Sequence, residues 1–411
     1  MKEITFIRHA ESAANSAGIW NGRSDGPLSE AGHSQLKALG ERLRDSSFDV
    51  VISSPLERAR RTAAAFSDDV VLDLEFVEID LGRWDGWTTE EVQSQDSEAL
   101  RAAISSRTSP MGTTGETLDE AGERVLNAVD KLVASLPDEA SAAVVTHGGL
   151  LQTVLHQYLP GGSHRAHSFV DNSAITTIRF FEDHSRLATF NDTGHLGPRS
   201  SQVAEFLAAG RTIVSLVRHG QTKANVEQRW QGQGDWDLDE VGYRQAAALG
   251  SCYGKWSSVF SSPLSRARNT AGFLAEAEPV LVDDLKELHM GEWEGLTTTE
   301  IEARWPDVLE EIYGKGVDLK RGTTGESWAE LTTRFTSAID TIEPASGEPT
   351  VVVAHGGAIR AYISSLTATT DTYAESLYTP RNTSVSHVAL TDRGPLILDY
   401  AVAPHLEALD S

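Results

Sequence analysis

Two short stretches place an arginine and a histidine at the end of an apolar run. Residues 4–9 read Ile-Thr-Phe-Ile-Arg-His, and residues 214–219 read Val-Ser-Leu-Val-Arg-His. Such a run has the length and β-branched content of a strand buried on both faces, so each Arg-His pair lies where a strand gives way to a loop. Ligands of open α/β sheets bind outside the carboxyl ends of the strands. A histidine held there beside a permanently charged arginine suits chemistry on an anionic, phosphate-like group.

Both stretches belong to an internal repeat with a period of about 210 residues. Six charged or polar residues of the first half return in the second half in the same order. They are Arg8, His9, Asn15, Arg58, Glu78 and His147, followed by Arg218, His219, Asn225, Arg266, Glu287 and His355. The period is too long for a solenoid repeat and predicts a duplicated domain.

Each of these residues alone has a plain structural interpretation. A single buried histidine is usually a hydrogen-bonded core residue, and a single arginine is usually a solvated surface group. A structural core would preserve an apolar pattern, whereas this repeat preserves charged and polar residues while the flanking sequence has diverged. The joint recurrence therefore favours a functional site in each half.

The repeated set fits phosphoryl transfer through a phosphohistidine. A neutral imidazole is a competent nucleophile near its ordinary pKa of about 6.5. Two guanidinium groups and a second imidazole can hold the phosphoryl oxygens without a metal ion, and a carboxyl group can protonate the leaving alkoxide and then activate water. The two glycines after each second histidine allow a close backbone approach and open a helix whose N–H groups face an anion.

The elements that must position this set alternate between strands and helices. We predict strands at 4–7, 48–52, 70–74 and 142–146 and a final hairpin at 174–180 and 187–190. Helices are predicted after Ser29 as an N-cap, after Pro55, over 116–136 and after His147. The predicted fold class is α/β, with two tandem α/β sandwich domains, each having a mostly parallel central sheet flanked by helices.

The predicted domains are residues 1–192 and 211–411. Between them, residues 193–210 are rich in Asp, Gly, Pro, Ser and Arg, with one short apolar patch at 203–207. This composition predicts a linker.

Both halves of the chain resemble the histidine phosphatase superfamily, also called the phosphoglycerate mutase-like family. The run Arg-His-Gly-Gln-Thr at 218–222 matches the family signature, whereas 8–12 departs from it with Ala10 in place of glycine and Ser12 in place of threonine. The resemblance covers nearly the whole chain apart from the linker. It implies two tandem phosphoglycerate mutase-like domains.

The resemblance also implies a role for each repeated residue. His9 and His219 would be the nucleophiles that become phosphorylated, and Glu78 and Glu287 would be the general acid and then base. His147 and His355 would complete the catalytic set. The phosphate would be bound by Arg8, Asn15 and Arg58 in the first half and by Arg218, Asn225 and Arg266 in the second.

Hydrolysis is favoured over transfer by the spacing after the acid. Mutases of the phosphoglycerate type carry a long insertion between the acid and the second histidine, and an Arg-Tyr pair soon after the acid. Here the separations are 147 − 78 = 69 and 355 − 287 = 68 residues, and Ile79-Asp80 and Leu288-His289 follow the acids. The expected enzyme is a metal-independent phosphomonoesterase that acts on small phosphorylated metabolites such as sugar phosphates.

Three alternatives stay open. One is a phosphoglycerate mutase-type phosphoryl transferase, and another is one active phosphatase domain beside a phospho-ligand-binding regulatory domain. The third, an interaction scaffold, would not need the repeated set. Retention of nucleophile and acid in both halves argues for two active sites. The doubtful position is Ala10, because a positive φ at the matching Gly220 would mean strain at Ala10 of roughly 1–2 kcal/mol.

Charge and composition limit the partners. The net charge is −25, with 60 acidic and 35 basic residues, which argues against a nucleic acid or an anionic membrane surface as partner. The one cysteine, Cys252, excludes a multi-thiolate metal site, and no His/Asp/Glu cluster has metal-ligand spacing. The start of the chain has no secretory leader and no apolar run is long enough for a membrane span, so a cytoplasmic location is expected, with no metal and no cofactor.

The segment expected to cover the site differs between the halves. Residues 107–111 stand in the first, and Lys315, Asp318, Lys320 and Arg321 stand in the second. One interpretation is a variable, solvated loop. The other is that the second half accepts a more anionic substrate, with a carboxylate or a second phosphate.

Overall fold

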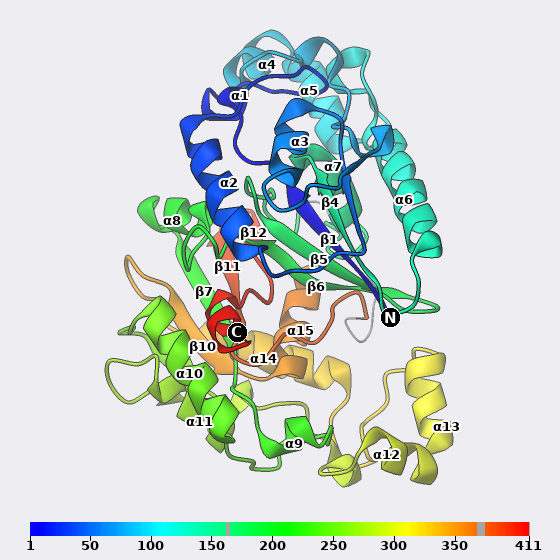
Figure 1. The fold of residues 1–411 in the computed structure, drawn as a ribbon. Helices are drawn as coiled ribbons and strands as arrows, with labels where there is room; N and C mark the ends of the chain where they lie inside the picture. The colour runs from blue at the N-terminus through cyan, green and yellow to red at the C-terminus, as the bar shows by residue number, and fades with distance from the viewer. Residues whose placement is uncertain (162–164, 368–374, 411) are drawn as a thin grey trace. The chain divides into compact units, whose positions relative to one another are not determined.

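The computed structural model describes residues 1–161, 165–367 and 375–410, which form two compact units (Figure 1). The first unit contains Met1–Tyr158 and Phe169–Gly197. The second contains Leu159–Ser168 and the chain from Pro198 onward. The domain boundaries at 192 and 211 stay a prediction.

A six-stranded sheet in the order β3-β2-β4-β1-β5-β6 forms the centre of the first unit. Neighbouring strands from β3 to β1 run parallel, whereas β5 runs antiparallel to β1 and forms a hairpin with β6. The strands are β1 (Lys2–Arg8), β2 (Val50–Ser53), β3 (Val71–Leu72), β4 (Ser141–Thr146), β5 (Ile175–Phe180) and β6 (Ser185–Asp192). Since β1 and β4 are parallel neighbours, their carboxyl ends meet at one edge of the sheet.

Helices of the first unit cover this sheet. On one face, Leu39 of α2 and Ala59 of α3 pack with Ile7 and Val145 in a buried cluster. Helices α6 and α7 of the same unit pack against each other (Figure 1). The helices are α1 (Ala13–Ser16), α2 (Glu30–Arg42), α3 (Glu57–Ala63), α4 (Thr89–Gln95), α5 (Ser97–Ser105), α6 (Leu118–Ser135) and α7 (Gly148–Leu155).

The second unit repeats the same sheet, in the order β9-β8-β10-β7-β11-β12. Its strands are β7 (Thr212–Arg218), β8 (Val259–Ser261), β9 (Val280–Leu281), β10 (Thr350–Ala354), β11 (Val385–Thr391) and β12 (Gly394–Ile397). Residues 166–168 lie beside β12, where the Ser168 N–H donates to the Ile397 carbonyl oxygen (2.8 Å).

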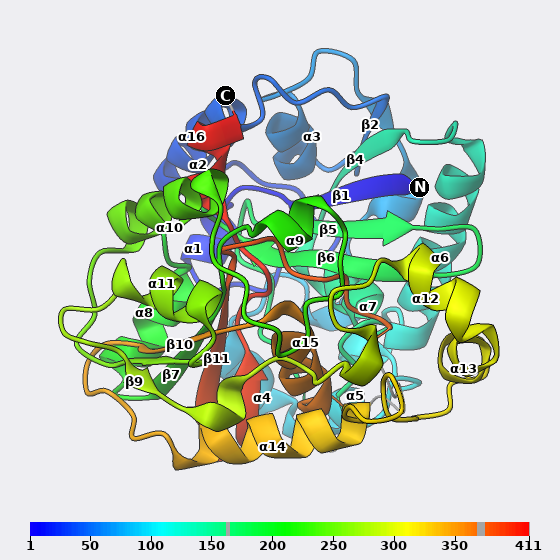
Figure 2. The same cartoon turned by 90° about the horizontal axis from the view of Figure 1, so that it is seen from below.

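Helices of the second unit match those of the first in their contacts with the sheet. Leu249 of α10 and Ala267 of α11 pack with Val217 and Val353 in the main buried cluster. Helices α14 and α15 pack against each other, with the rings of Phe335 and Tyr362 6.0 Å apart (Figure 2). The helices are α8 (Ser201–Ala208), α9 (Lys223–Val226), α10 (Glu240–Tyr253), α11 (Ser265–Gly272), α12 (Thr298–Arg304), α13 (Pro306–Leu309), α14 (Trp328–Thr341), α15 (Gly356–Ser365) and α16 (Glu407–Asp410).

The predicted α/β class with two tandem, mostly parallel sheets is confirmed. The third strand is shorter than predicted, because Asp73 caps a 3₁₀ turn at Leu74–Phe76 that ends it. The predicted linker contains α8, whose Val203 is buried against Ile213. Among the helices of the described chain, none has both the length and the apolar character needed to span a membrane.

Candidate active site

The two histidines of the first unit follow neighbouring strands. His9 comes directly after β1, and His147 comes directly after β4 and is the N-cap of α7. Their rings are buried, with centroids 5.1 Å apart. In the second unit the rings of His219 and His355 are buried with centroids 5.2 Å apart. The duplicated sequence therefore builds the same histidine pair twice.

The backbone sets the tautomer of each first histidine. His9 Nδ1 lies 2.8 Å from the Ala10 carbonyl oxygen, and His219 Nδ1 lies 2.7 Å from the Gly220 carbonyl oxygen. Because a carbonyl oxygen only accepts, Nδ1 carries the proton and Nε2 keeps its lone pair. Each ring thus presents an unprotonated Nε2, the form that a nucleophile needs.

A buried arginine, from α3 in the first unit and from α11 in the second, lies against these rings. Arg58 donates through Nη1 to the Ser24 carbonyl (2.8 Å) and through Nη2 to the Gly22 carbonyl (2.7 Å), and its Nε lies 3.3 Å from His9 Nε2. Two of its three nitrogens are thereby held by the loop after α1. The remaining nitrogen is directed to the histidine pair.

Arg266 of the second unit has the same arrangement. It donates through Nη1 to the Gly234 carbonyl (2.8 Å) and through Nη2 to the Gly232 carbonyl (2.7 Å). Its Nε lies 3.2 Å from His355 Nδ1. In the second unit this nitrogen therefore faces the second histidine of the pair, whereas in the first unit it faces the first histidine.

The arginine that ends the first strand is anchored by the loop before the final hairpin. Arg8 Nη1 donates to the Val170 carbonyl and Arg218 Nη1 to the Pro380 carbonyl, both at 2.5 Å. Their Nε atoms are buried and have no hydrogen-bond partner within the described chain, and the same holds for His147 Nδ1. Buried donors without partners are costly, so a cluster of them marks a place built for an acceptor such as a phosphoryl oxygen.

Burial and the arginines keep the histidines neutral. Burial lowers the pKa of His9 and of His147 well below the usual value, and the charges of Arg58 and Arg8 lower both further. The pKa values of His219 and His355 are lowered in the same way, by burial first and then by Arg266. At neutral pH all four imidazoles are therefore uncharged.

The arginines themselves stay charged. Burial lowers the pKa of Arg218 and of Arg266 to about 10, and it also lowers the pKa of Arg8 and of Arg58. Each site thus combines one buried and one half-buried positive charge with two neutral rings, an environment that favours a phosphate dianion.

The glutamates sit on the N-termini of α7 and α15. Glu78 accepts hydrogen bonds from the N–H groups of Gly149 (3.0 Å) and Leu150 (2.9 Å), and it is almost completely buried. Glu287 accepts in the same way from Gly357 and Ala358, both at 2.9 Å. The group at this helix terminus is therefore a glutamate carboxyl of the chain itself, and the double glycine makes room for it.

The asparagines expected to bind phosphate have a structural contact as well. Asn15 Oδ1 accepts from the Ser12 N–H (3.2 Å) in the capping box of α1 and lies 3.3 Å from Asn172 Nδ2. Asn225 makes the matching contacts with Thr222 and Asn382. The amide oxygen is engaged in each case, which leaves the amide Nδ2 as the group able to meet a ligand.

Two further residue pairs belong to the sites, and the sequence analysis missed them. Asn172 donates to the His9 carbonyl (3.0 Å) and Asn382 to the His219 carbonyl (2.9 Å). Ser54 Oγ lies 2.7 Å from His147 Nε2, and Ser262 Oγ lies 2.8 Å from His355 Nε2. Their signal was present in the repeat, since all four recur at matching positions.

Strain at Ala10 is absent. Neither Ala10 nor Gly220 has a positive φ. A Cβ at Gly220 would lie 2.7 Å from the Gly242 carbonyl oxygen, so this glycine serves a close approach to α10. The departure from the signature in the first half leaves the backbone of the nucleophile loop unstrained.

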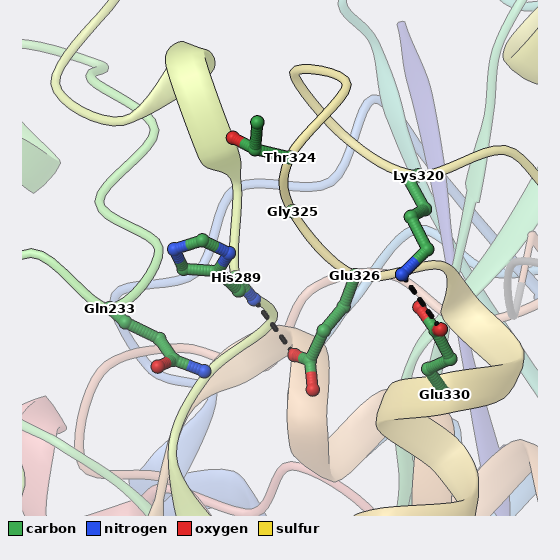
Figure 3. Close-up of a pocket in the computed structure, with 7 residues that line it drawn as sticks. All are labelled: Gln233, His289, Lys320, Thr324, Gly325, Glu326 and Glu330. Atoms are coloured by element: carbon green, nitrogen blue, oxygen red, sulfur yellow. Dashed lines mark hydrogen bonds and ion pairs between the residues drawn. The ribbon is translucent and has the colours of Figure 1, made fainter.

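A pocket of about 510 Å³ opens beside Glu287 in the second unit. Figure 3 shows the residues that line it: Gln233, His289, Lys320, Thr324, Gly325, Glu326 and Glu330. The segment expected to cover the second site contributes Lys320 alone of its four named charged residues to the lining of this pocket. Lys320 pairs with Glu330 (2.9 Å). Arg321 is buried against Asp318, and Lys315 pairs with Glu311, so neither is presented to a ligand there.

Within the described residues no group of three or more His, Cys, Asp or Glu side chains is placed to hold a metal ion.

Comparisons with known proteins follow the duplication. The histidine phosphatase superfamily (branch 1) matches residues 4–193 and again 214–402. The chain is 35% identical over 206 residues to a metal-independent phosphoserine phosphatase of Arabidopsis thaliana, covering 48% of the chain and 84% of that relative. It is 30% identical over 202 residues to phosphoserine phosphatase 1 of Hydrogenobacter thermophilus, covering 48% and 95%. A solved mycobacterial glucosyl-3-phosphoglycerate phosphatase matches at a TM-score of 0.43 with 26% identity, covering 46% of the chain and 99% of that structure.

The neutral histidines predict a loss of stability in mild acid. The unfolded chain takes up protons near the ordinary histidine pKa of about 6.5, whereas the folded chain does not, since the pKa values of His9, His147, His219 and His355 are lowered and that of His195 falls to about 4. Below about pH 6.5 unfolding therefore takes up protons, and each such histidine lowers the free energy of unfolding by at most about 1.4 kcal/mol per pH unit.

Urea denaturation checks this expectation. The midpoint should fall between about pH 7 and pH 5, and it should fall less in a His147→Gln/His355→Gln variant, which removes two of these groups. Equal midpoints of the wild-type protein at the two pH values would contradict the neutral state of the buried rings.

Proposed function

We propose, because the chain belongs to the histidine phosphatase superfamily, that it is a metal-independent phosphomonoesterase with one phosphohistidine site in each unit. The observation that carries this is the pairing, in both units, of an unprotonated Nε2 with two guanidinium groups, one buried and one half-buried. Its substrates are small phosphorylated metabolites. The phosphoserine phosphatases among its relatives make phosphoserine the first compound to test.

In the first step Nε2 of His9 or His219 attacks phosphorus. The bond between phosphorus and the ester oxygen breaks as the N–P bond forms, and Glu78 or Glu287 donates a proton to the leaving alkoxide. The paired arginines and the second histidine bind the equatorial oxygens, where charge develops.

In the second step a water molecule attacks the phosphohistidine. The same glutamate, now a carboxylate, takes a proton from that water while the N–P bond breaks, and inorganic phosphate leaves. The neutral imidazole and the protonated carboxyl are thereby restored. Positive charge comes from arginine throughout, so no metal ion takes part.

The spacing after the acids supports hydrolysis over transfer, as argued above. The near-identity of the two sites, with histidine rings 5.1 and 5.2 Å apart, supports turnover in both units over a purely regulatory one. A mutase would instead pass the phosphoryl group to a second hydroxyl compound, and product analysis with labelled substrate separates the two reactions.

Removal of each nucleophile tests the double site. His9→Ala and His219→Ala should each keep hydrolysis and form an acid-labile, alkali-stable phosphoenzyme on the other histidine, with EDTA present throughout. The double variant should lose both. Hydrolysis by the double variant would contradict the mechanism, and an inactive single variant across a broad substrate panel would show that one unit is not a phosphatase.

Substitution of the acid tests its role. Glu78→Gln in a His219→Ala background should lower kcat for an alkyl phosphate by about 10²–10⁴-fold, while inhibition by inorganic phosphate changes little. The effect should be smaller with p-nitrophenyl phosphate, whose leaving group needs no proton. Glu75→Gln, on an exposed neighbouring residue, is the control. Unchanged turnover of the alkyl phosphate would remove Glu78 from the mechanism.

The double glycine offers a test of the position of the acid. A Cβ at Gly149 would lie 2.7 Å from Glu78 Oε1, so Gly149→Ala must displace the carboxyl group. A shift near 1 Å can cost about 10²-fold in rate, and we expect a kcat loss of that order in the first unit. Gly122→Ala, where the added Cβ meets nothing closer than 3.5 Å, should leave kcat unchanged. Equal rates for both variants would contradict the assignment.

A further inference from the structure

The two sites differ at a position beside the catalytic glutamate. Arg23 stands in the first unit where Gln233 stands in the second. Both side chains point to the main-chain carbonyl of the glutamate, with Arg23 Nε 3.5 Å from the Glu78 oxygen and Gln233 Nε2 3.1 Å from the Glu287 oxygen. The two residues therefore occupy the same place, and one brings a charge that the other lacks.

Arg23 pairs with a carboxylate that already has other hydrogen-bond donors. Its Nη2 lies 3.0 Å from Glu116, which Arg124 already binds through two nitrogens (2.9 and 3.0 Å). The Asp80 N–H donates to the same carboxylate at 3.0 Å.

The second unit shows that this carboxylate keeps its place without the extra arginine. Glu326 accepts from two nitrogens of Arg334, both at 2.8 Å, and from the His289 N–H at 2.9 Å. In this unit the position of Arg23 is occupied by the uncharged Gln233. Arg23 is therefore a surplus cation at Glu116.

Arg23 is also free to exchange partners. Its side chain is 44% exposed, and its second acidic neighbour, Asp80, is 42% exposed and 3.7 Å away. Solvent-exposed ion pairs contribute little to stability, less than a hydrogen-bonded pair with a substrate anion inside a site. A guanidinium fork matches a carboxylate or a phosphate in shape.

We propose that the site of the first unit selects phosphomonoesters that carry a second anionic group close to the phosphate, and that Arg23 binds that group. This inference rests on the proposed function and names its substrate class. The second unit has a different cation, Lys320, which lies across the pocket from Gln233 and pairs with Glu330 (Figure 3). Selection at the position beside the acid thus belongs to the first unit.

Matched substrates test the proposal in the full-length chain with the other nucleophile removed. The pairs are 3-phosphoglycerate with glycerol 3-phosphate, and O-phosphoserine with O-phosphoethanolamine, each differing by one carboxylate. In the His219→Ala background, Arg23→Gln should lower the ratio of kcat/KM between the members with and without the carboxylate by about 10- to 100-fold. Arg23→Lys should keep part of the ratio. In the His9→Ala background, Gln233→Arg should raise it.

Two controls separate selection from structure. Arg61→Gln, which removes an exposed arginine paired with Glu57, should leave the ratio unchanged, and melting curves should show that all variants fold. Inhibition of p-nitrophenyl phosphate hydrolysis by the same four compounds gives the ratio even where they turn over slowly. If Arg23→Gln lowers kcat/KM equally for both members of a pair, the role assigned to Arg23 is wrong, while the proposed function stands. Absence of hydrolysis of every phosphomonoester would overturn the proposed function and the assignment with it.

Discussion

The placement of two guanidinium groups, one buried and one half-buried, beside two buried imidazoles is the interaction on which each site depends. A buried cation without partners is strongly destabilising, and the chain answers this with backbone carbonyls, from Gly22 and Ser24 for Arg58 and from Val170 for Arg8. The same positive charges oppose protonation of the rings next to them. One arrangement therefore fixes the loops, keeps the nucleophile neutral and prepares the site for a dianion.

The start of α7 concentrates the rest of the machinery in four consecutive residues. His147 caps the helix and supplies the second ring, while Gly148 lies so close to Arg8 that a Cβ would be 3.0 Å from its Nε. The next two N–H groups hold Glu78. Because one helix terminus contacts three functional groups, a small movement of α7 would disturb all of them together.

Much of this could be predicted from the sequence. Apolar runs and the repeat predicted the α/β class, and the recurrence of charged residue types identified histidines, arginines and glutamates that the structure brings together. Contacts of common polar residues could not be predicted, since Asn172 and Ser54 recur in the second half but their recurrence does not say which groups they contact. The sequence also could not predict that the N–H groups at the start of α7 bind Glu78, or that Arg321 pairs with Asp318, because both contacts depend on packing in three dimensions.

Arg8 and the nucleophile loop are held by the loop before the last hairpin of their own unit, through Arg8 to Val170 and through Asn172 to His9. These contacts join residues 162 and 163 positions apart, among the longest separations in the unit. Contacts of such range form late in folding, because the closure of long loops must precede them. A chain emerging from the ribosome would thus lack a complete site in the first unit until residues 170–172 had docked on the end of β1 and the loop after it. Catalytic competence of the first unit then reports that this late segment of the chain has docked.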